Sequence, residues 1–130
     1  MGEGVVKAIS NSSIRAYAHC SFNDSGHRQS RDLTIMLMNL QPRSDPGAKP
    51  RHVILSTSVT AIATTEYHLT SGGADTTSTS VKLNGVTLSA TADGMVPDMT
   101  GRAGRTDAVL LEPASIAFVV IHGAGAAHGC

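Results

Sequence analysis

Residues Ser80–Ser89 read SVKLNGVTLS, and this stretch carries the strongest local structural signal in the chain. It places Asn84-Gly85 between two runs in which apolar and polar residues alternate. Asn-Gly favours a type I′ turn, because both central residues of that turn need a positive φ. Alternation with a period of two is typical of a half-buried strand. The stretch therefore predicts a β-hairpin that turns at Asn84 and Gly85.

The same β pattern extends through the rest of the chain. The segment Asp32–Leu40 is apolar through its middle, as expected of a strand that is buried on both faces. Turn-rich stretches separate the segments, and none of them combines a helical period with caps. We therefore expect an all-β fold, an antiparallel β-sandwich of about seven to eight short strands. The expected strands are Ile14–His19, Asp32–Leu40, Val53–Val59, Glu66–Thr70, Ser80–Leu83, Val86–Ser89, Ala108–Leu111 and Ser115–Ile121.

The length of 130 residues predicts one domain, spanning residues 1–130. Ten basic and ten acidic residues balance, so we expect no nucleic-acid partner bound through general electrostatics. No apolar run approaches the ~20 residues of a transmembrane helix. The start of the chain, MGEGVVK, lacks the basic and apolar regions of a signal peptide. The glycine-rich segment His122–His128 has no helix after it, so it is not expected to bind a dinucleotide.

The chain has two cysteines, Cys20 and Cys130. A bond between them would tie the end of the chain to the start of the fold, and closing so long a loop stabilises a protein by roughly 4–5 kcal/mol. A lasting disulfide also implies an oxidising compartment. The spacing leaves two free thiols as an equal alternative. Asn11 and Asn23 each begin an Asn-X-Ser tripeptide, which predicts N-glycosylation if the chain follows a secretory route.

Candidate catalytic residues are few. A glycosidase needs two carboxylates at the scissile bond, and the glutamates Glu3, Glu66 and Glu112 form no matched pair in the sequence. His19 and Cys20 are neighbours on a predicted strand and should point to opposite faces. A histidine so placed is a poor base for a cysteine nucleophile. We therefore expect no catalytic residue in this chain.

Histidine and cysteine residues could supply nitrogen and sulfur ligands to a metal. Neither of the two possible groups has the compact paired spacing of a structural zinc site. A bridge between the two cysteines would also remove both thiolates. We expect no metal and no other cofactor, and a metal-binding β domain is the least favoured alternative. The groups are His19, Cys20 and His27, and His122, His128 and Cys130.

Five segments, in a fixed order, resemble the C-terminal region of heparanase-like proteins, the endo-β-glucuronidase family of glycoside hydrolases. The sequence Tyr67–Thr70 is most similar to the plant branch, and the resemblance covers roughly residues 5–130. The loops 41–51 and 99–107 depart from the family pattern. The five segments are Arg15–Cys20, Asp32–Leu40, Glu66–Thr70, Val81–Leu88 and Pro113–Ile121.

The resemblance implies a non-catalytic β-sandwich that supports the folding, secretion and stability of a (β/α)8 barrel. Both catalytic glutamates of the family lie on that barrel, which nothing in this chain matches. The chain alone is then expected to be inactive and to meet an acidic glycan only through the barrel. The family's sandwich also takes in a strand from the N-terminal part of the protein. The resemblance further implies a Cys20–Cys130 bridge and an extracellular, lysosomal or vacuole-like compartment.

A stand-alone β-sandwich module that binds glycan or protein is the alternative function. Sugar-binding platforms present flat aromatic rings, and this chain has four aromatic residues. We expect one or more of them to be needed in the core, which leaves few for a platform. The four are Tyr17, Phe22, Tyr67 and Phe118.

Overall fold

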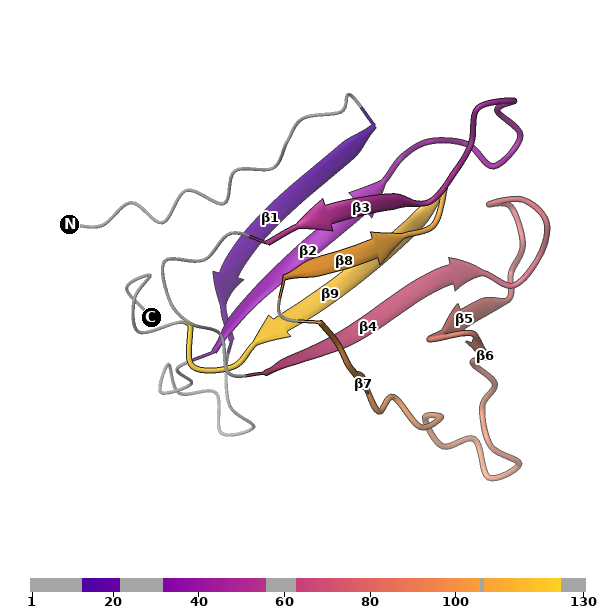
Figure 1. The fold of residues 1–130 in the computed structure, drawn as a ribbon. Coiled ribbons are helices and arrows are strands. Elements are labelled where there is room, and N and C mark those ends of the chain that lie inside the picture. The colour runs from indigo at the N-terminus through magenta and orange to yellow at the C-terminus, as the bar shows by residue number, and fades with distance from the viewer. Residues whose placement is uncertain (1–12, 22–31, 56–62, 106, 125–130) are drawn as a thin grey trace.

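The structure, a computed structural model, describes residues 13–21, 32–55, 63–105 and 107–124. These residues form nine strands and no helix (Figure 1). Every strand pairing among them is antiparallel. The prediction of an all-β antiparallel fold is confirmed, with more strands than expected. The strands are β1 (Ile14–Cys20), β2 (Leu33–Asn39), β3 (Arg51–Ile54), β4 (Thr64–Ser71), β5 (Val81–Leu83), β6 (Val86–Thr87), β7 (Arg102–Ala103), β8 (Ala108–Leu111) and β9 (Ser115–Ile121).

Seven strands form one large sheet in the order β1-β2-β9-β4-β5-β6, and β7 pairs with β4 beside this path. The long strands β1, β2, β9 and β4 lie side by side (Figure 1). At the centre, β2 and β9 pair along their whole lengths, from Leu33 opposite Ile121 to Asn39 opposite Ser115. These two strands are the most apolar of the four long strands of the large sheet, which explains why they occupy its middle.

The second layer is the two-stranded sheet of β3 and β8, which lies on one face of β2 and β9 (Figure 1). Asn39 is buried between the layers and donates from Nδ2 to Leu111 O at 3.5 Å. The described residues therefore form two layers without closing a sandwich. Both layers share one core, which is built from Ile14, Leu33, Ile35, Leu37, Leu55, Val109, Leu111, Ala117, Val119, Ile121 and Ala124.

The hairpin predicted from the sequence is present. Asn84 and Gly85 join β5 to β6 with φ values of 49° and 85°. Leu83 pairs with Val86 across the turn. Both central residues are thus left-handed, as a type I′ turn requires. The second strand of the hairpin is shorter than expected, because β6 ends at Thr87.

The strand β7 lies in a stretch that the sequence indicated as a turn. Thr65 pairs with Ala103 and Glu66 pairs with Arg102. A strand of two residues has no periodicity to detect, and glycine allows its close approach to β4. A Cβ atom on Gly101 would lie 2.7 Å from Tyr67 Cζ. The strand β3 also begins earlier than expected, at Arg51, and residues 56–59 of that predicted strand lie outside the described residues.

The large sheet is apolar on its outer face too, the face away from β3 and β8. Register places Tyr17, Met36, Phe118 and Tyr67 in one row across β1, β2, β9 and β4. Three of the chain's four aromatic residues therefore lie on this outer face, and the buried cluster of the described residues holds no aromatic side chain. The expectation that the core would need an aromatic residue is wrong for this part of the chain, because aliphatic residues fill it.

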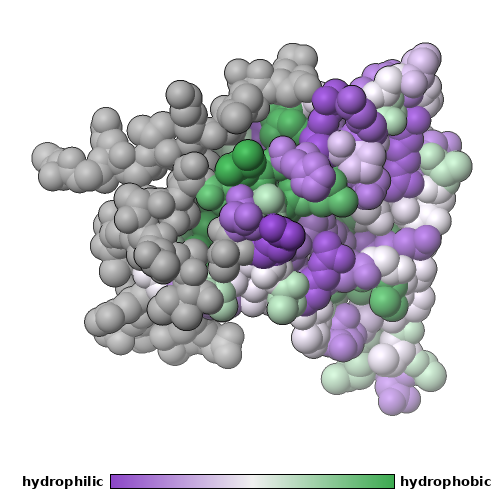
Figure 2. All heavy atoms as spheres, in the orientation of Figure 1, coloured by the Kyte–Doolittle hydropathy of each residue, from purple (hydrophilic) through white to green (hydrophobic). Residues whose placement is uncertain are grey.

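The small sheet also presents apolar side chains outward. Ile54 on β3 is 60% exposed and Leu110 on β8 is 43% exposed. Figure 2 shows hydrophobic surface gathered over these two strands, with hydrophilic residues beside it. Contiguous apolar surface of this kind is a feature of protein contact sites.

Candidate functional site

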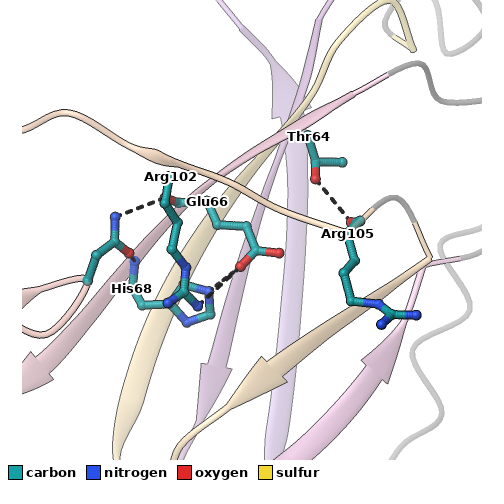
Figure 3. A network of polar contacts seen from close by, with 6 residues as sticks. Thr64, Glu66, His68, Arg102 and Arg105 are labelled. Atoms are coloured by element: carbon teal, nitrogen blue, oxygen red, sulfur yellow. Dashed lines mark hydrogen bonds and ion pairs between the residues drawn. The ribbon is translucent and has the colours of Figure 1, made fainter.

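A buried carboxylate lies on the inner face of β4. Strand alternation puts Glu66 and His68 on the same face, where their side chains are 7% and 10% exposed. His68 Nε2 lies 2.7 Å from Glu66 Oε2. Arg102 on β7 donates from Nη2 to the same oxygen at 3.4 Å (Figure 3). Two nitrogen donors therefore converge on one carboxylate oxygen, which compensates for its removal from water.

The turn residue Asn84 holds the backbone of β4 at this point. Its Oδ1 accepts the backbone N–H of His68 at 2.9 Å, and its Nδ2 donates to Glu66 O at 3.2 Å. The backbone N–H of Asn84 donates to His68 O at 2.8 Å. The residue that shapes the β5–β6 turn thus also fixes the strand segment that presents Glu66 and His68.

Residues after β7 close the network from one side. Gly104 N–H donates to Thr64 O at 3.0 Å, and Thr64 Oγ1 donates to Arg105 O at 3.0 Å (Figure 3). A Cβ atom on Gly104 would lie only 2.6 Å from Glu66 Cδ. Glycine is therefore what allows the chain to cover the Glu66 carboxylate.

A groove of about 310 Å³ lies beside this network, between β4 and the edge of β8. Among the described strands β8 pairs with β3 alone, so its other edge faces the groove. The Leu55 N–H donates to Asp107 O at 2.9 Å, and hydrogen-bonded pairs alternate along an antiparallel ladder. The backbone N–H and C=O of Leu110 consequently point away from β3. The lining residues are His68, Thr70, Asn84, Gly85, Arg102, Leu110, Glu112 and Ser115.

The geometry suits binding better than glycoside cleavage. Cleavage of a glycosidic bond needs two carboxylates that flank an open site. Glu112 lines the groove, whereas Glu66 is buried against His68, Arg102 and Gly104 and does not. What the groove offers is an edge of β8 that pairs with no other described strand, with His68 and Arg102 on the opposite wall.

Several residues singled out in the sequence lie outside the described residues. Cys20 is the last residue of β1, but its predicted partner Cys130 is not described, so the disulfide stays a prediction. The glycosylation of Asn11 and Asn23 stays a prediction for the same reason. Residues 27 and 128 of the possible metal groups are also outside the described part.

Within the described ranges, no group of three or more His, Cys, Asp or Glu residues could hold a metal ion. His19 is exposed on β1, and its Nδ1 lies 3.0 Å from Cys20 O. The described part of the chain also contains no helix with the length and apolar character to cross a membrane.

This network was not predicted from the sequence. The spacing of Glu66 and His68 by two residues was the available signal, since it places them on one face of a strand. Arg102 and Gly104 gave no such signal, because they lie in a stretch that reads as a turn. Their role becomes visible only when β7 pairs with β4.

Comparison with known proteins gives no family for this chain. No protein-family model matches it. No curated protein matches it either.

Proposed function

We propose that the chain is the non-catalytic C-terminal β-sandwich domain of a heparanase-like endo-β-glucuronidase. In this role it supports the folding, secretion and stability of a catalytic barrel, in an extracellular, lysosomal or vacuole-like compartment. One observation carries the proposal. The five segments that resemble the family are separate in the sequence, yet they coincide with β1, β2, β4, the β5–β6 hairpin and β9. These strands make up the whole continuous path of the large sheet.

Two exposed apolar faces support a role in which the domain packs against a larger partner. The outer face of the large sheet and the outward face of the small sheet both present apolar side chains, Tyr17 and Leu110 among them. Exposed apolar faces and free strand edges are liabilities in a domain that works alone. A catalytic barrel packed against one of these faces would remove that liability.

The groove beside β8 fits the strand that the resemblance implies from the N-terminal part of the parent protein. An extended segment there would pair with the backbone of Leu110 and enlarge the small sheet to three strands. Its side chains on one face would lie over His68 and Arg102. The second layer would then cover more of the large sheet.

An activity assay tests the non-catalytic role. We expect the purified chain to release no more glucuronic acid from β-glucuronide substrates than a heat-denatured sample does. Turnover above that background, lost on removal of Glu112, would overturn the proposal.

A binding experiment tests the strand site. The probe is a peptide that matches the N-terminal strand of a plant heparanase-like protein. Leu110→Pro removes an N–H that β3 does not use, and proline is tolerated on edge strands. Leu110→Ala keeps this N–H and serves as the matched control. We expect Leu110→Ala to bind the peptide and Leu110→Pro to lose binding. Equal binding by both variants would count against strand addition at β8.

The alternative, a module that binds glycan, gains support from the outer face. Tyr17 is 54% exposed and lies in one row with Phe118 and Tyr67. Aromatic rings in a row suit the flat faces of sugar units. Glycan-array binding that Tyr17→Ala abolishes would favour this alternative over the support role.

A further inference from the structure

A second polar cluster lies on the other face of β4, where the ends of three strands meet. Thr65 belongs to β4, His122 directly follows β9, and Asp32 directly precedes β2. His122 Nδ1 lies 2.9 Å from Asp32 Oδ2. His122 Nε2 lies 2.8 Å from Thr65 Oγ1. A carboxylate, an imidazole and a hydroxyl group thus form one chain of hydrogen bonds.

The turn after β9 holds the carboxylate and the imidazole in place. Gly123 N–H donates to Asp32 Oδ1 at 2.9 Å, so both oxygens of the carboxylate are engaged. Gly123 has a φ of 76°, which favours glycine. The backbone N–H of His122 donates to Ala63 O at 3.0 Å. The imidazole ring of His122 therefore extends from a backbone that is anchored to the residue before β4.

The hydrogen bonds dictate where the protons lie. A carboxylate can only accept, so Nδ1 of His122 carries its proton toward Asp32. In the neutral ring Nε2 is then an acceptor, and the hydroxyl of Thr65 donates to it. This is the arrangement that activates a hydroxyl nucleophile, with a base oriented by a third group. The side chains of His122 and Asp32 are 41% and 29% exposed, so a small molecule can approach from solvent.

We propose that Thr65 is a nucleophile activated by His122, with Asp32 as a positioning residue, and that it reacts with small activated acyl compounds. Thr65 Oγ1 forms a bond to the acyl carbon, and His122 Nε2 takes the hydroxyl proton. The bond between the acyl carbon and the leaving oxygen breaks, and that oxygen departs with the electron pair and takes the proton from His122 Nε2. Water then attacks the acyl carbon and gives a proton to His122 Nε2. The bond from that carbon to Thr65 Oγ1 breaks, Oγ1 takes the proton back from His122, and a carboxylic acid is released. This acyl transfer is separate from glycoside cleavage, the reaction for which the domain is proposed to be non-catalytic, and it does not depend on the barrel proposed above.

Labelling with a fluorophosphonate tests the nucleophile in the full chain. Thr65 Oγ1 would bond to phosphorus, fluoride would leave, and the hydroxyl proton would pass to His122. Peptide mapping by mass spectrometry should find the label on Thr65, and Thr65→Ser should keep it. The matched control is Thr34→Val, because the Thr34 hydroxyl lies 2.6 Å from Ser21 Oγ and forms no hydrogen bond to a histidine among the described residues. This variant should label at the rate of the unmodified chain.

Variants of the base and its positioning residue complete the test. We expect His122→Gln to slow labelling about 100-fold, the usual contribution of a general base. Asp32→Asn should slow it by at least about tenfold, and Asp32→Glu should recover part of that rate. Absence of label on Thr65 in the folded chain would overturn the proposal and leave the cluster as a link between strand ends. Labelling of His122→Gln at the full rate would also overturn it.

Discussion

Glu66 Oε2 lies 2.7 Å from His68 Nε2, and both residues come from the buried face of one strand. Neighbours at this spacing share a face of the sheet, so the pair is set by β4 itself. Arg102 joins the pair from β7. The contact therefore couples the pairing of β7 with β4 to the burial of a carboxylate.

Removal of the buried carboxylate should destabilise the chain. We expect Glu66→Ala to lower the free energy of unfolding by about 2–3 kcal/mol, because hydrogen bonds to a charged group are lost and His68 keeps a buried unpaired nitrogen. Urea unfolding followed by circular dichroism measures the change. Glu112→Ala is the control, since that side chain is exposed and its removal should change stability by less than about 0.5 kcal/mol. Equal effects of the two substitutions would contradict the prediction.

A methyl group at Gly104 should push directly on the same carboxylate. We expect Gly104→Ala to cost about 1–3 kcal/mol, because the new Cβ would lie 2.6 Å from Glu66 Cδ. Gly47→Ala is the control, because no heavy atom lies within 4 Å of a Cβ there. Thermal or urea unfolding of both variants checks the difference.

A double-mutant cycle separates this clash from a backbone effect. In the Glu66→Ala background the side chain at position 66 is shorter. Gly104→Ala should therefore lower the free energy of unfolding by less than it does in the unmodified chain. If its cost is the same in both backgrounds, the glycine is needed for a reason other than Glu66.

Much of the fold could be predicted from local patterns. Asn84-Gly85 specified a turn that the structure contains, because few residue pairs adopt positive φ at both positions. The apolar segment Asp32–Leu40 indicated a strand with two apolar faces, and β2 has them. What could not be predicted is β7, since two residues carry no period and its position depends on β4.

The two polar clusters show more clearly which contacts could not be predicted from the sequence. Glu66 and His68 are two residues apart, so their shared face follows from the sequence. Asp32 and His122 are 90 residues apart, and His122 and Thr65 are 57 residues apart. Only the order of the strands in the sheet brings these three together. Sequence spacing therefore reveals contacts within one strand and misses contacts between strands.

The positions of β1 and β9 in the large sheet are consistent with the predicted Cys20–Cys130 disulfide. Cys20 pairs with Leu33, and Leu33 pairs with Ile121, so β1 and β9 end on the same side of the molecule. Two strand spacings, about 10 Å, separate those ends. The six residues that follow Ala124 can span up to about 20 Å when extended. Cys130 is therefore within reach of Cys20 by chain length.

We expect the folded chain to have no free thiol. Its intact mass should be lower than that of the reduced chain by the two thiol hydrogens. Cys20→Ser should lower the free energy of unfolding by about 4–5 kcal/mol. Cys130→Ser and the double variant should lose the same amount, because all three remove one bridge. Two alkylated cysteines in native, unreduced protein would rule the bridge out.

Two exposed Asp-X-Thr turns offer a test of local electrostatics at acid pH. Thr100 donates to Asp98 Oδ1 from its hydroxyl at 2.6 Å and from its backbone N–H at 2.9 Å. The hydroxyl, and then the N–H, hold the pKa of Asp98 below its ordinary value. Thr77 lowers the pKa of Asp75 in the same way. A carboxyl group whose pKa is lowered in the folded state stabilises the fold at pH values above its pKa in the unfolded chain, which is about 3.9. This stabilisation disappears as the pH falls through the lower pKa of the folded state.

Each turn serves as the control for the other. Thr100→Val removes the hydroxyl donor, so the pKa of Asp98 should rise toward its ordinary value while that of Asp75 stays unchanged. Thr77→Val should have the reverse effect. An NMR titration of the carboxyl carbons between about pH 2 and 7 follows both groups at once. If both aspartates move together in either variant, a change in the global fold or net charge is responsible, because a hydrogen bond within one turn cannot reach the other.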